Sequence, residues 1–505
     1  MTPSSYSLFV LGALFCCVLT PLVRNFALKY GFLDCPKRAR KVHKHAVPRL
    51  GGAAILFSFL LVLGFGGLTV PDLRNFLWGN SRVGGIVVVG SLCIFVIGVL
   101  DDLSRLSPKV KLLGEFLIAA CVVWFANLGF DKVQFLGFGE LFVADWIGFG
   151  LACLWIVGMA NAVNLIDGLD GLAAGVTLMG LTAIALVSFL VDLPHVIWMA
   201  TMLIGCILGF LVFNSRPASI FLGDCGSLTL GYLAGCLSLM GSARGDGMID
   251  GLFPIFAFFI PVADCSFAIV RRMLRGRSPF IADMEHFHHR LMAKGLTHGK
   301  AVLALWSAAL CCGLVAVAAA FGRGDQLTAL LVTFGLAGFV LLRYLGYFRF
   351  DFFGKGLVSL VQDRENARIA EQVVKEVEGM VALSQDFGDL DQAIERASTA
   401  LGFAEVKLSF FHENGLLGVS SDSSARQVRE VISWADSQSS GYFSRESAFK
   451  AEFQLRGLRY VYGSVNYQFL DGRKSLEVHD EILLERIHDA ISSLAGRVRR
   501  SEAKD

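Results

Sequence analysis

The sequence contains little charge. Only 17% of its 505 residues are charged, against about 25% in an average soluble protein, and 54% are hydrophobic. The shortage excludes an ordinary water-soluble protein, so we expect most of the chain to lie in a membrane. The net charge of +2 says little about partners, and we expect no nucleic acid among them.

Cysteine patterns typical of zinc sites or disulfide frameworks are also missing. The twelve cysteines lie mostly in apolar runs, and no two are spaced as C-x-x-C. We interpret them as buried thiols of an inner-membrane protein. The N-terminus lacks the basic segment and the small-residue cleavage site of a signal peptide, so its first apolar run is expected to remain as a helix.

Apolar runs long enough to cross about 30 Å of hydrocarbon as helices recur along the first 350 residues. They lie near 7–24, 51–70, 83–100, 111–129, 146–164, 171–191, 196–213, 226–241, 252–273, 301–321 and 327–345. The pattern predicts a polytopic α-helical membrane protein with about eleven transmembrane helices. Because 226–241 is short and rich in glycine, ten spans are the alternative.

The basic residues of the connecting loops are distributed asymmetrically. The even-numbered loops contain only Arg74, Arg82, Lys132, Arg244 and Arg323, whereas the odd-numbered loops contain most of the Lys and Arg of this region. Loops rich in Lys and Arg normally stay in the cytoplasm. We therefore expect a bacterial inner (plasma) membrane protein with its C-terminus inside. This orientation places every cluster of acidic and histidine residues on the cytoplasmic side.

After Tyr347 the composition becomes that of a soluble protein, which divides the chain into expected domains at 1–350 and 360–505. Helices are predicted over 364–384, 388–401 and 477–496, and strands over 404–411, 448–455 and 459–469. We expect a cytoplasmic α+β domain of regulatory or interaction type. Its histidines, at 412, 479 and 488, are isolated, so it contains no catalytic constellation.

A polar stretch, Asn161 to Leu172 (NAVNLIDGLDGL), ends an otherwise apolar run. Polar groups are costly in a bilayer and normally face a bundle interior, a cavity or an aqueous rim. Asn161, Asn164 and Asp167 are three residues apart and share one face of a continuing helix. The glycines that follow Asp167 and Asp170 break the helix and allow the backbone to approach a ligand closely. The alternative is a polar loop that caps a helix.

Asp101 and Asp102 directly follow the apolar run 86–100. Adjacent carboxylates beside a low-dielectric wall repel each other, which suits one of them to take up or give a proton. Alternatively, they hold a divalent cation through oxygen ligands, or form a solvated interfacial pair. Lys109 and Lys111 could balance these acids or contact a phosphate.

The segment Asn214 to Ser227 (NSRPASIFLGDCGS) places Asp224 between two glycines at the start of a helix. A carboxylate there suits Mg²⁺, which keeps some waters and binds substrate phosphates. Phe221 could stack on a base, or be packed in the protein.

The segment Asp283 to Arg290 (DMEHFHHR) contains three histidines in four positions, at 286, 288 and 289, beside an arginine. No cysteine lies close by, and the spacing is not that of a zinc protease. Histidine and arginine suit a diphosphate better, the alternative being a basic interfacial loop. Together, these segments in a membrane indicate phosphoryl transfer between a cytoplasmic nucleotide and a lipid.

The sequence resembles the polyprenyl-phosphate N-acetylhexosamine-1-phosphate transferases over about residues 30–300. The matching segments occur in the same order: Asp34 to Gly52 (DCPKRARKVHKHAVPRLGG), Asp101-Asp102 with Pro108 to Lys111, Asn161 to Gly175, Phe213 to Gly231 and Gly276 to Leu291. The resemblance implies transfer of a sugar-1-phosphate, with GlcNAc favoured, from a UDP-N-acetylhexosamine to undecaprenyl phosphate. Mg²⁺, or Mn²⁺ in its place, is the implied cofactor. The reaction would initiate cell-envelope glycan synthesis, such as that of lipopolysaccharide, O-antigen or teichoic acid.

The resemblance also implies roles for individual residues. Metal binding falls to Asp224 and Asn164, and handling of the lipid phosphate to Asp101 or Asp102. Asp167 and Asp170 would line the nucleotide-sugar site. Contacts to uracil, phosphate or sugar are implied for Asn214, Phe221, Lys111, His286, His288 and His289. Both a one-step attack and a two-step route through an aspartyl intermediate are compatible with the family, and we favour one step.

Alternatives to this interpretation differ in their sequence requirements. A phospho-N-acetylmuramoyl-pentapeptide transferase is disfavoured by the segment HKHAVPRLGG and by the spelling HFHHRL. A transporter would require charged residues near the bilayer midplane, and a membrane-anchored sensor would leave the polar clusters without a role. Residues 360–505 faintly resemble a GAF-like sensory module. This domain could bind a regulator or a downstream glycosyltransferase, and the sequence leaves a homodimer open.

Overall fold

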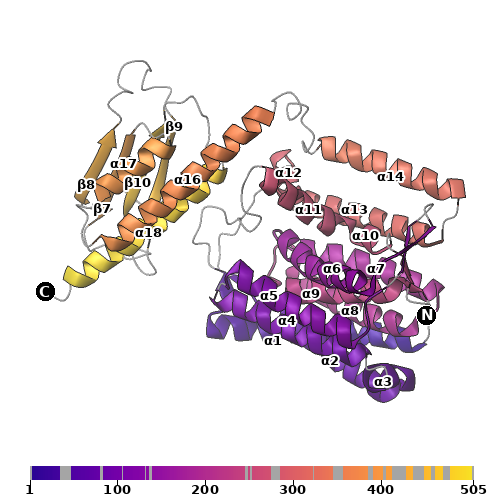
Figure 1. Cartoon of the computed structure of the whole chain (residues 1–505). Coiled ribbons are helices and arrows are strands. Elements are labelled where there is room, and N and C mark those ends of the chain that lie inside the picture. The colour runs from indigo at the N-terminus through magenta and orange to yellow at the C-terminus, as the bar shows by residue number, and fades with distance from the viewer. Residues whose placement is uncertain are drawn as a thin grey trace. The chain divides into compact units, whose positions relative to one another are not determined.

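The computed structural model describes residues 3–34, 47–79, 83–104, 106–130, 132–135, 139–244, 248–250, 253–274, 285–321, 324–344, 357–384, 390–401, 405–411, 428–435, 449–456, 461–469 and 478–502. The chain forms two compact units (Figure 1). The first comprises residues 1–270 and 285–349, and the second residues 271–284 and 350–505. Each unit has its own hydrophobic core.

The first unit is a bundle of long apolar helices. Among the described residues, eight helices are long and apolar enough to cross a membrane. They are α1 (Pro3–Tyr30), α2 (Gly51–Thr69), α4 (Val83–Ser104), α6 (Asp145–Ile166), α7 (Leu172–Leu190), α8 (Pro194–Asn214), α9 (Gly223–Ser242) and α13 (His298–Phe321). All eight fall on predicted spans, and the chain is a multi-pass membrane protein.

The other three expected spans correspond to helices of a different character. They match α5 (Pro108–Phe125), the pair α10 (Phe253–Ala257) and α11 (Phe259–Leu274), and α14 (Gly324–Tyr344). Helix α5 carries Lys109, Lys111 and Glu115, and a turn at Phe258 separates α10 from α11. A total of eleven spans therefore stays a prediction. Two short helices, α3 (Pro71–Trp78) and α12 (Phe287–Ala293), complete the helices among the described residues of this unit.

Helix α9 lies at the centre of the bundle. It packs against α2, α4, α6 and α7, and all of its residues from Cys225 to Ser242 are buried. A Cβ on Gly52 of α2 would lie 2.2 Å from the Cα of Gly226 in α9. Only glycine allows so close a crossing, so the packing of α2 on α9 requires Gly52 and Gly226.

The helix ends define two ends of the bundle. Helices α4, α6 and α8 finish, and α5, α7 and α9 begin, at the end where Asp101, Asn164 and Asp224 meet. At the other end, β3 (Lys132–Phe135) pairs with β4 (Gly139–Phe142) and, in parallel, with β6 (Met248–Asp250), which pairs with β5 (Ala243–Arg244). The sequence did not predict this small sheet. A further short pair, β1 (Leu33–Asp34) with β2 (Val47–Pro48), precedes α2.

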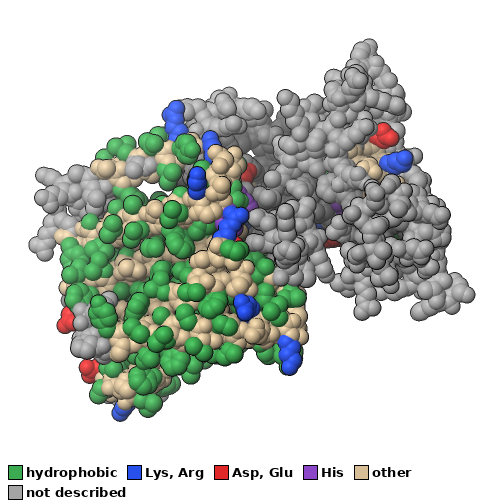
Figure 2. All heavy atoms as spheres, turned by 180° about the vertical axis from the view of Figure 1, so that it is seen from behind, with side chains coloured by type: hydrophobic (Ala, Val, Ile, Leu, Met, Phe, Trp, Pro, Cys, Tyr) green, Lys and Arg blue, Asp and Glu red, His purple; other side chains and the backbone are tan. Residues whose placement is uncertain are grey.

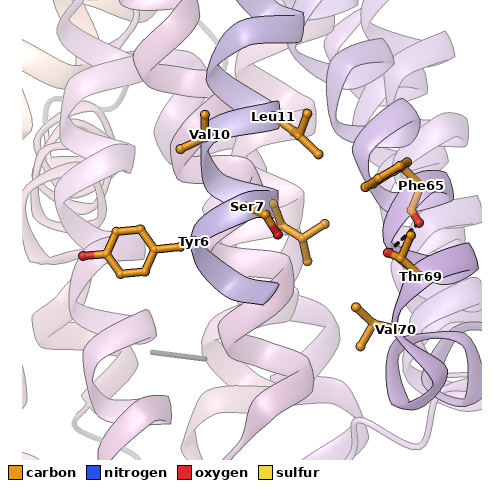
Figure 3. Close-up of a pocket in the computed structure, with 8 residues that line it drawn as sticks. Tyr6, Ser7, Val10, Leu11, Phe65, Thr69 and Val70 are labelled. Carbon is orange, nitrogen blue, oxygen red and sulfur yellow. Dashed lines mark hydrogen bonds between the residues drawn. The ribbon is translucent and has the colours of Figure 1, made fainter. Parts of the chain in front are cut away.

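The surface of the first unit suits a lipid environment. Figure 2 shows hydrophobic side chains over most of its described surface on one side, with most of the Lys and Arg side chains in view gathered along one edge. An apolar groove of about 660 Å³ lies between the start of α1 and the end of α2, lined by Leu8, Val10, Leu11, Phe65 and their neighbours (Figure 3). Because α2 begins beside Phe221, this groove lies at the bundle end away from Asp224.

The second unit is an α+β fold. The elements among its described residues are α16 (Leu357–Leu383), α17 (Leu390–Leu401), β7 (Glu405–Phe411), β8 (Val428–Ala435), β9 (Phe449–Arg456), β10 (Val461–Phe469) and α18 (Val478–Glu502). The antiparallel sheet has the order β8-β7-β10-β9. The predicted helices and three strands are confirmed, whereas β8 was not predicted. Likeness to a GAF module stays a prediction.

Apolar residues of the helices and of the sheet share the core of this unit. Val377 and Val381 of α16, Val406 of β7 and Ile487 of α18 are buried together. Ile369, earlier in α16, is 52% exposed. The pairing of Arg486 with Glu378, at 2.8 and 2.5 Å, joins α18 to α16.

His488 makes the second unit sensitive to acid. Its Nε2 lies 2.7 Å from the hydroxyl of the buried Tyr467, and burial lowers the pKa of His488 from 6.5 to about 4. The unfolded chain therefore binds the proton first, so stability is complete above about pH 6.5 and is lost as pH falls toward about 4. The loss can reach about 3 kcal/mol.

We expect the melting temperature of a fragment comprising residues 357–505, followed by circular dichroism, to fall between pH 7 and pH 4.5. The variant His488→Gln keeps a polar partner for Tyr467 but does not titrate, so its melting temperature should fall less. If the melting temperatures of the two proteins fell by the same amount between pH 7 and pH 4.5, the assignment to His488 would be contradicted.

Candidate active site

A lysine at the start of α5 forms the centre of the polar cluster. The Nζ of Lys111 lies 2.7 Å from Asp101 Oδ2, 3.3 Å from Asn164 Oδ1 and 3.5 Å from Asp224 Oδ2. These partners come from the ends of α4 and α6 and the start of α9. Three oxygen-bearing side chains, distant in sequence, thus converge on one cationic group.

Asn164 orients the acid at the start of α9. Its Nδ2 donates to Asp224 Oδ1 at 2.9 Å and to Ser227 Oγ at 2.8 Å, while its Oδ1 faces Lys111. Both the nitrogen and the oxygen of the Asn164 amide are therefore engaged. Asn164 and Asp224, the two residues predicted to bind a metal, are in direct contact. The side chain of Asp224 is 39% exposed, so it remains accessible to a ligand.

Asp102 has a different environment from its neighbour. Its two carboxylate oxygens accept the backbone N–H groups of Asp224, at 3.1 Å, and Cys225, at 3.0 Å, and its side chain is only 4% exposed. The first N–H groups of a helix have no partner within the helix, and a carboxylate there also opposes the positive end of the helix dipole. Asp102 thus caps α9 and places Asp224, while Arg49 approaches it to 4.0 Å.

Asp101 is held as well. Its Oδ1 accepts the N–H of Leu106 at 2.9 Å, and its Oδ2 accepts from Lys111. The two adjacent aspartates therefore have separate tasks: Asp101 faces Lys111, and Asp102 faces the helix start. The hydrogen bonds of the two carboxylates account for their positions without a cation shared between them.

Asp167 directly follows α6 and lies among other acids. Burial, followed by the nearby charges of Asp224, Asp102 and Asp170, raises the pKa of Asp167 to about 8, against an opposing contribution from Arg49. A carboxyl group with this pKa exchanges a proton near neutral pH, as acid–base chemistry requires.

Asp170 braces two loops. Its N–H donates to His298 Nε2 at 3.0 Å, and its Oδ2 accepts the N–H of Ala218 at 3.2 Å.

Asn214 is 4% exposed, and its Nδ2 donates to Ile220 O at 2.9 Å. Phe221 is half-buried, and its N–H donates to Pro48 O at 2.8 Å. Asp170 and Asn214 thus shape the loop that leads to Asp224, and Phe221 pairs that loop with the segment before α2.

The histidine segment approaches this region through His288. A Cβ on Gly168 would lie 2.4 Å from His288 Nε2, so the ring packs directly on the backbone beside Asp167. Burial, then the charges of His289, His286 and His298, lowers the pKa of His288 to about 3, which keeps this ring neutral. His286 is also buried, whereas His289 is half-buried, and Arg290 pairs with Glu285 at 2.6 Å.

Several residues of the site were not predicted from the sequence. Glu115 is 1% exposed and accepts a hydrogen bond from the side-chain amide of Asn161. Ser227, Asp264 and His298 contact predicted residues directly. Glu115 and Asp264 could have been found, because each is a carboxylate within an apolar run.

The donor chemistry suits a hard cation. Among the described residues, no group of three His, Cys, Asp or Glu has metal-binding spacing, so a cage built only from such side chains is not present there. Asp224 and Asn164 nevertheless offer carboxylate and amide oxygens beside a region already shaped around the positive charge of Lys111. Mg²⁺ is commonly held by one or two carboxylates together with waters and substrate phosphates.

The fold and this geometry define a class of protein: a multi-pass membrane protein whose helix ends gather acids, an amide and a lysine around an accessible carboxylate. A family model described as glycosyl transferase family 4 matches residues 85–242, which include Asp101, Lys111, Asn164 and Asp224.

Similarity to individual proteins is more extensive. The chain is 39% identical to a probable undecaprenyl-phosphate N-acetylglucosaminyl 1-phosphate transferase of Bacillus subtilis, over 59% of this chain and 80% of that protein. It is 33% identical to a decaprenyl-phosphate N-acetylglucosaminephosphotransferase of Mycolicibacterium smegmatis, over 60% and 78%. It is 26% identical to an undecaprenyl-phosphate alpha-N-acetylglucosaminyl 1-phosphate transferase of Salmonella typhi, over 65% and 87%. The chain therefore belongs to glycosyl transferase family 4, in the branch of polyprenyl-phosphate hexosamine-1-phosphate transferases.

The contact between Gly168 and His288 gives a direct test of the site. We expect Gly168→Ala to displace the His288 ring or the Asp167 backbone, because the new Cβ would lie 2.4 Å from Nε2. Transferase activity should fall by about tenfold or more, since small misplacements in an active site have large effects on rate.

Gly158→Ala is the matched control. Gly158 lies in α6, and its Cβ would meet nothing within 4 Å, so this substitution should leave activity unchanged and slightly favour the helix. Equal activities of the two purified variants would show that the close packing of Gly168 on His288 is not required.

Proposed function

We propose that this protein transfers N-acetylglucosamine-1-phosphate from UDP-N-acetylglucosamine to undecaprenyl phosphate and releases UMP. The observation that carries the proposal is the convergence of Asp101, Asn164 and Asp224 on Lys111. The names of the relatives support the choice of sugar and of a polyprenyl phosphate acceptor.

The reaction joins two negatively charged groups. An oxygen of the lipid phosphate attacks the phosphorus that bears the sugar, a new P–O bond forms, and the bond to the UMP oxygen breaks. Positioning and neutralisation of charge provide most of the catalysis in such transfers. Lys111 supplies one fixed positive charge at the point where the phosphates meet.

Mg²⁺ would supply the remaining charge neutralisation when bound. Asp224 and Asn164 would hold it, because Asp224 is accessible and Asn164 fixes its orientation. Asp102 would act indirectly, by holding the start of α9 and therefore Asp224 in place.

A one-step transfer fits the arrangement of the acids. A phosphate monoester has a second pKa of about 6, so it already carries most of its charge at neutral pH and needs little help from a base. Asp101 is engaged by Lys111 and Leu106, which suits it to orient Lys111. Asp167 would then handle any proton exchanged with the nucleotide-sugar.

The polar cluster would face the cytoplasm. Lys29, Lys109 and Arg216 belong to the same bundle end as Asp224, at the end of α1, the start of α5 and the loop after α8. This distribution supports a cytoplasmic location for that end in a bacterial inner membrane, where UDP-sugars are available. The second unit would regulate the enzyme or bind a partner.

The metal assignment predicts the effect of removing Asp224. Asp224→Ala should lower incorporation of labelled GlcNAc into lipid by at least about 100-fold, the scale seen when a preorganised charge-stabilising group is lost. Asp224→Asn should retain more activity and require more Mg²⁺.

These activities can be measured with membranes containing the protein, UDP-[¹⁴C]GlcNAc, undecaprenyl phosphate and a Mg²⁺ titration. Asp145→Asn, which removes an exposed carboxylate at the start of α6, serves as the control and should behave as the wild type. Full activity of Asp224→Ala at every Mg²⁺ concentration would exclude Asp224 as the metal ligand.

The two separate cores predict that residues 355–505 are dispensable for catalysis. A chain truncated after Gly354 should insert in membranes and retain most of its transferase activity, because the cluster and its supports lie between residues 49 and 298. Truncation after Lys300 removes most of α13, which packs on α7, and should abolish activity. If both truncated chains were inactive while present at normal amounts, residues 355–505 would be part of the catalytic machinery.

A further inference from the structure

A buried carboxylate lies outside the polar cluster described above. Asp264 is in α11, within an apolar stretch of the helix, and is only 1% exposed. A buried carboxylate is costly unless its oxygens are satisfied by hydrogen bonds. The partners of Asp264 are therefore informative about its task.

Both oxygens of Asp264 contact the start of α12. Oδ1 accepts the N–H of Phe287 at 2.8 Å, and Oδ2 lies 2.9 Å from Nδ1 of His286. Because an ionised carboxylate only accepts hydrogen bonds, the ring nitrogen facing it must carry the proton. The contact therefore fixes the proton on Nδ1 of His286 and the orientation of its ring, with Nε2 on the far side from Asp264.

The His286 ring continues toward the acid cluster. It stacks on His288 with 5.9 Å between centroids and an angle of 4° between the planes. His288 in turn packs on Gly168, beside Asp167. A chain of direct contacts thus connects Asp264 to the backbone at the end of α6, where the nucleotide-sugar is proposed to bind.

We propose that Asp264 is a positioning residue of the transferase, which acts on the substrate through His286. By holding Nδ1–H, it leaves Nε2 of His286 as a hydrogen-bond acceptor for a hydroxyl or amide N–H of the sugar in the bound nucleotide-sugar. This inference rests on the proposed function, since it requires that His286 contacts that substrate. Outer partners of functional histidines fix the tautomer and the ring orientation in the same way.

The competing role is purely structural: Asp264 would anchor α12 to α11 through Phe287 alone. The variant Asp264→Asn separates the two roles. The Asn Oδ1 can still accept from Phe287 N–H, but its Nδ2 donates to Nδ1 of His286 and moves the ring proton to Nε2. The anchor is kept, whereas the tautomer is reversed.

The test uses the purified full-length enzyme with UDP-GlcNAc and undecaprenyl phosphate. We expect Asp264→Asn to lower kcat/KM for UDP-GlcNAc by about 10–100-fold, while KM for undecaprenyl phosphate and the melting temperature stay near the wild-type values. Asp264→Glu keeps a carboxylate and should recover part of the loss.

A double-mutant cycle shows whether Asp264 acts through His286. His286→Asn places an amide near the position of Nδ1 but has no atom at Nε2, so it should be impaired to a similar degree. In that background, Asp264→Asn should cause less than about a twofold further loss. Independent, multiplying losses, or a lowered melting temperature with unchanged specific activity, would assign Asp264 the structural role and overturn the inference.

The outcome for the wild type separates this inference from the proposed function. A wild-type enzyme that does not transfer GlcNAc-1-phosphate contradicts the proposed function itself. An active wild type with a fully active Asp264→Asn variant contradicts only the role of Asp264.

Discussion

The site depends on how the start of α9 is held in place. The first N–H groups of a helix have no partner within the helix, and leaving one unpaired in the protein is costly. Asp102 accepts two of them, from Asp224 and Cys225, and Gly52 and Gly226 allow α2 and α9 to cross closely. Because these contacts fix α9, they fix Asp224 relative to α4 and α6. The reactive end of the bundle is thus positioned by helix capping and close packing.

The second constraint is electrostatic. Acids crowd the ends of α4, α6 and α9, and in a low-dielectric setting such crowding is tolerable only with compensating positive charge. Lys111 provides this charge from α5, at 2.7 Å from Asp101 and 3.5 Å from Asp224. Arg49, in the segment before α2, lies 4.0 Å from Asp102. The positive charges that stabilise this cluster of acids are also the charges that a pair of phosphates requires. Stability and phosphate chemistry therefore place the same demand on these residues.

The sequence allowed much of this arrangement to be predicted, for identifiable reasons. Apolar runs and polar interruptions are local signals, so the spans and the residues at 101, 111, 164 and 224 could be found without coordinates. Local signals do not report pairing, however. Nothing in the pair Asp101-Asp102 distinguishes the residue that caps a helix 122 positions away from the residue that meets Lys111. Similarly, β8 and the sheet of β3 and β6 depend on partners distant in sequence, and His298 is known to support Asp170 only from their contact.

The small sheet at the far end of the bundle has a mechanical consequence. The parallel pairing of β3 with β6 ties the connection before α6 to the connection after α9. At the opposite end, Asn164 and Asp224 join the same two helices again. Helices α6 and α9 are therefore joined near both of their ends, by backbone pairing at one end and by a side-chain hydrogen bond at the other. The two connections together keep Asn164 aligned with Asp224.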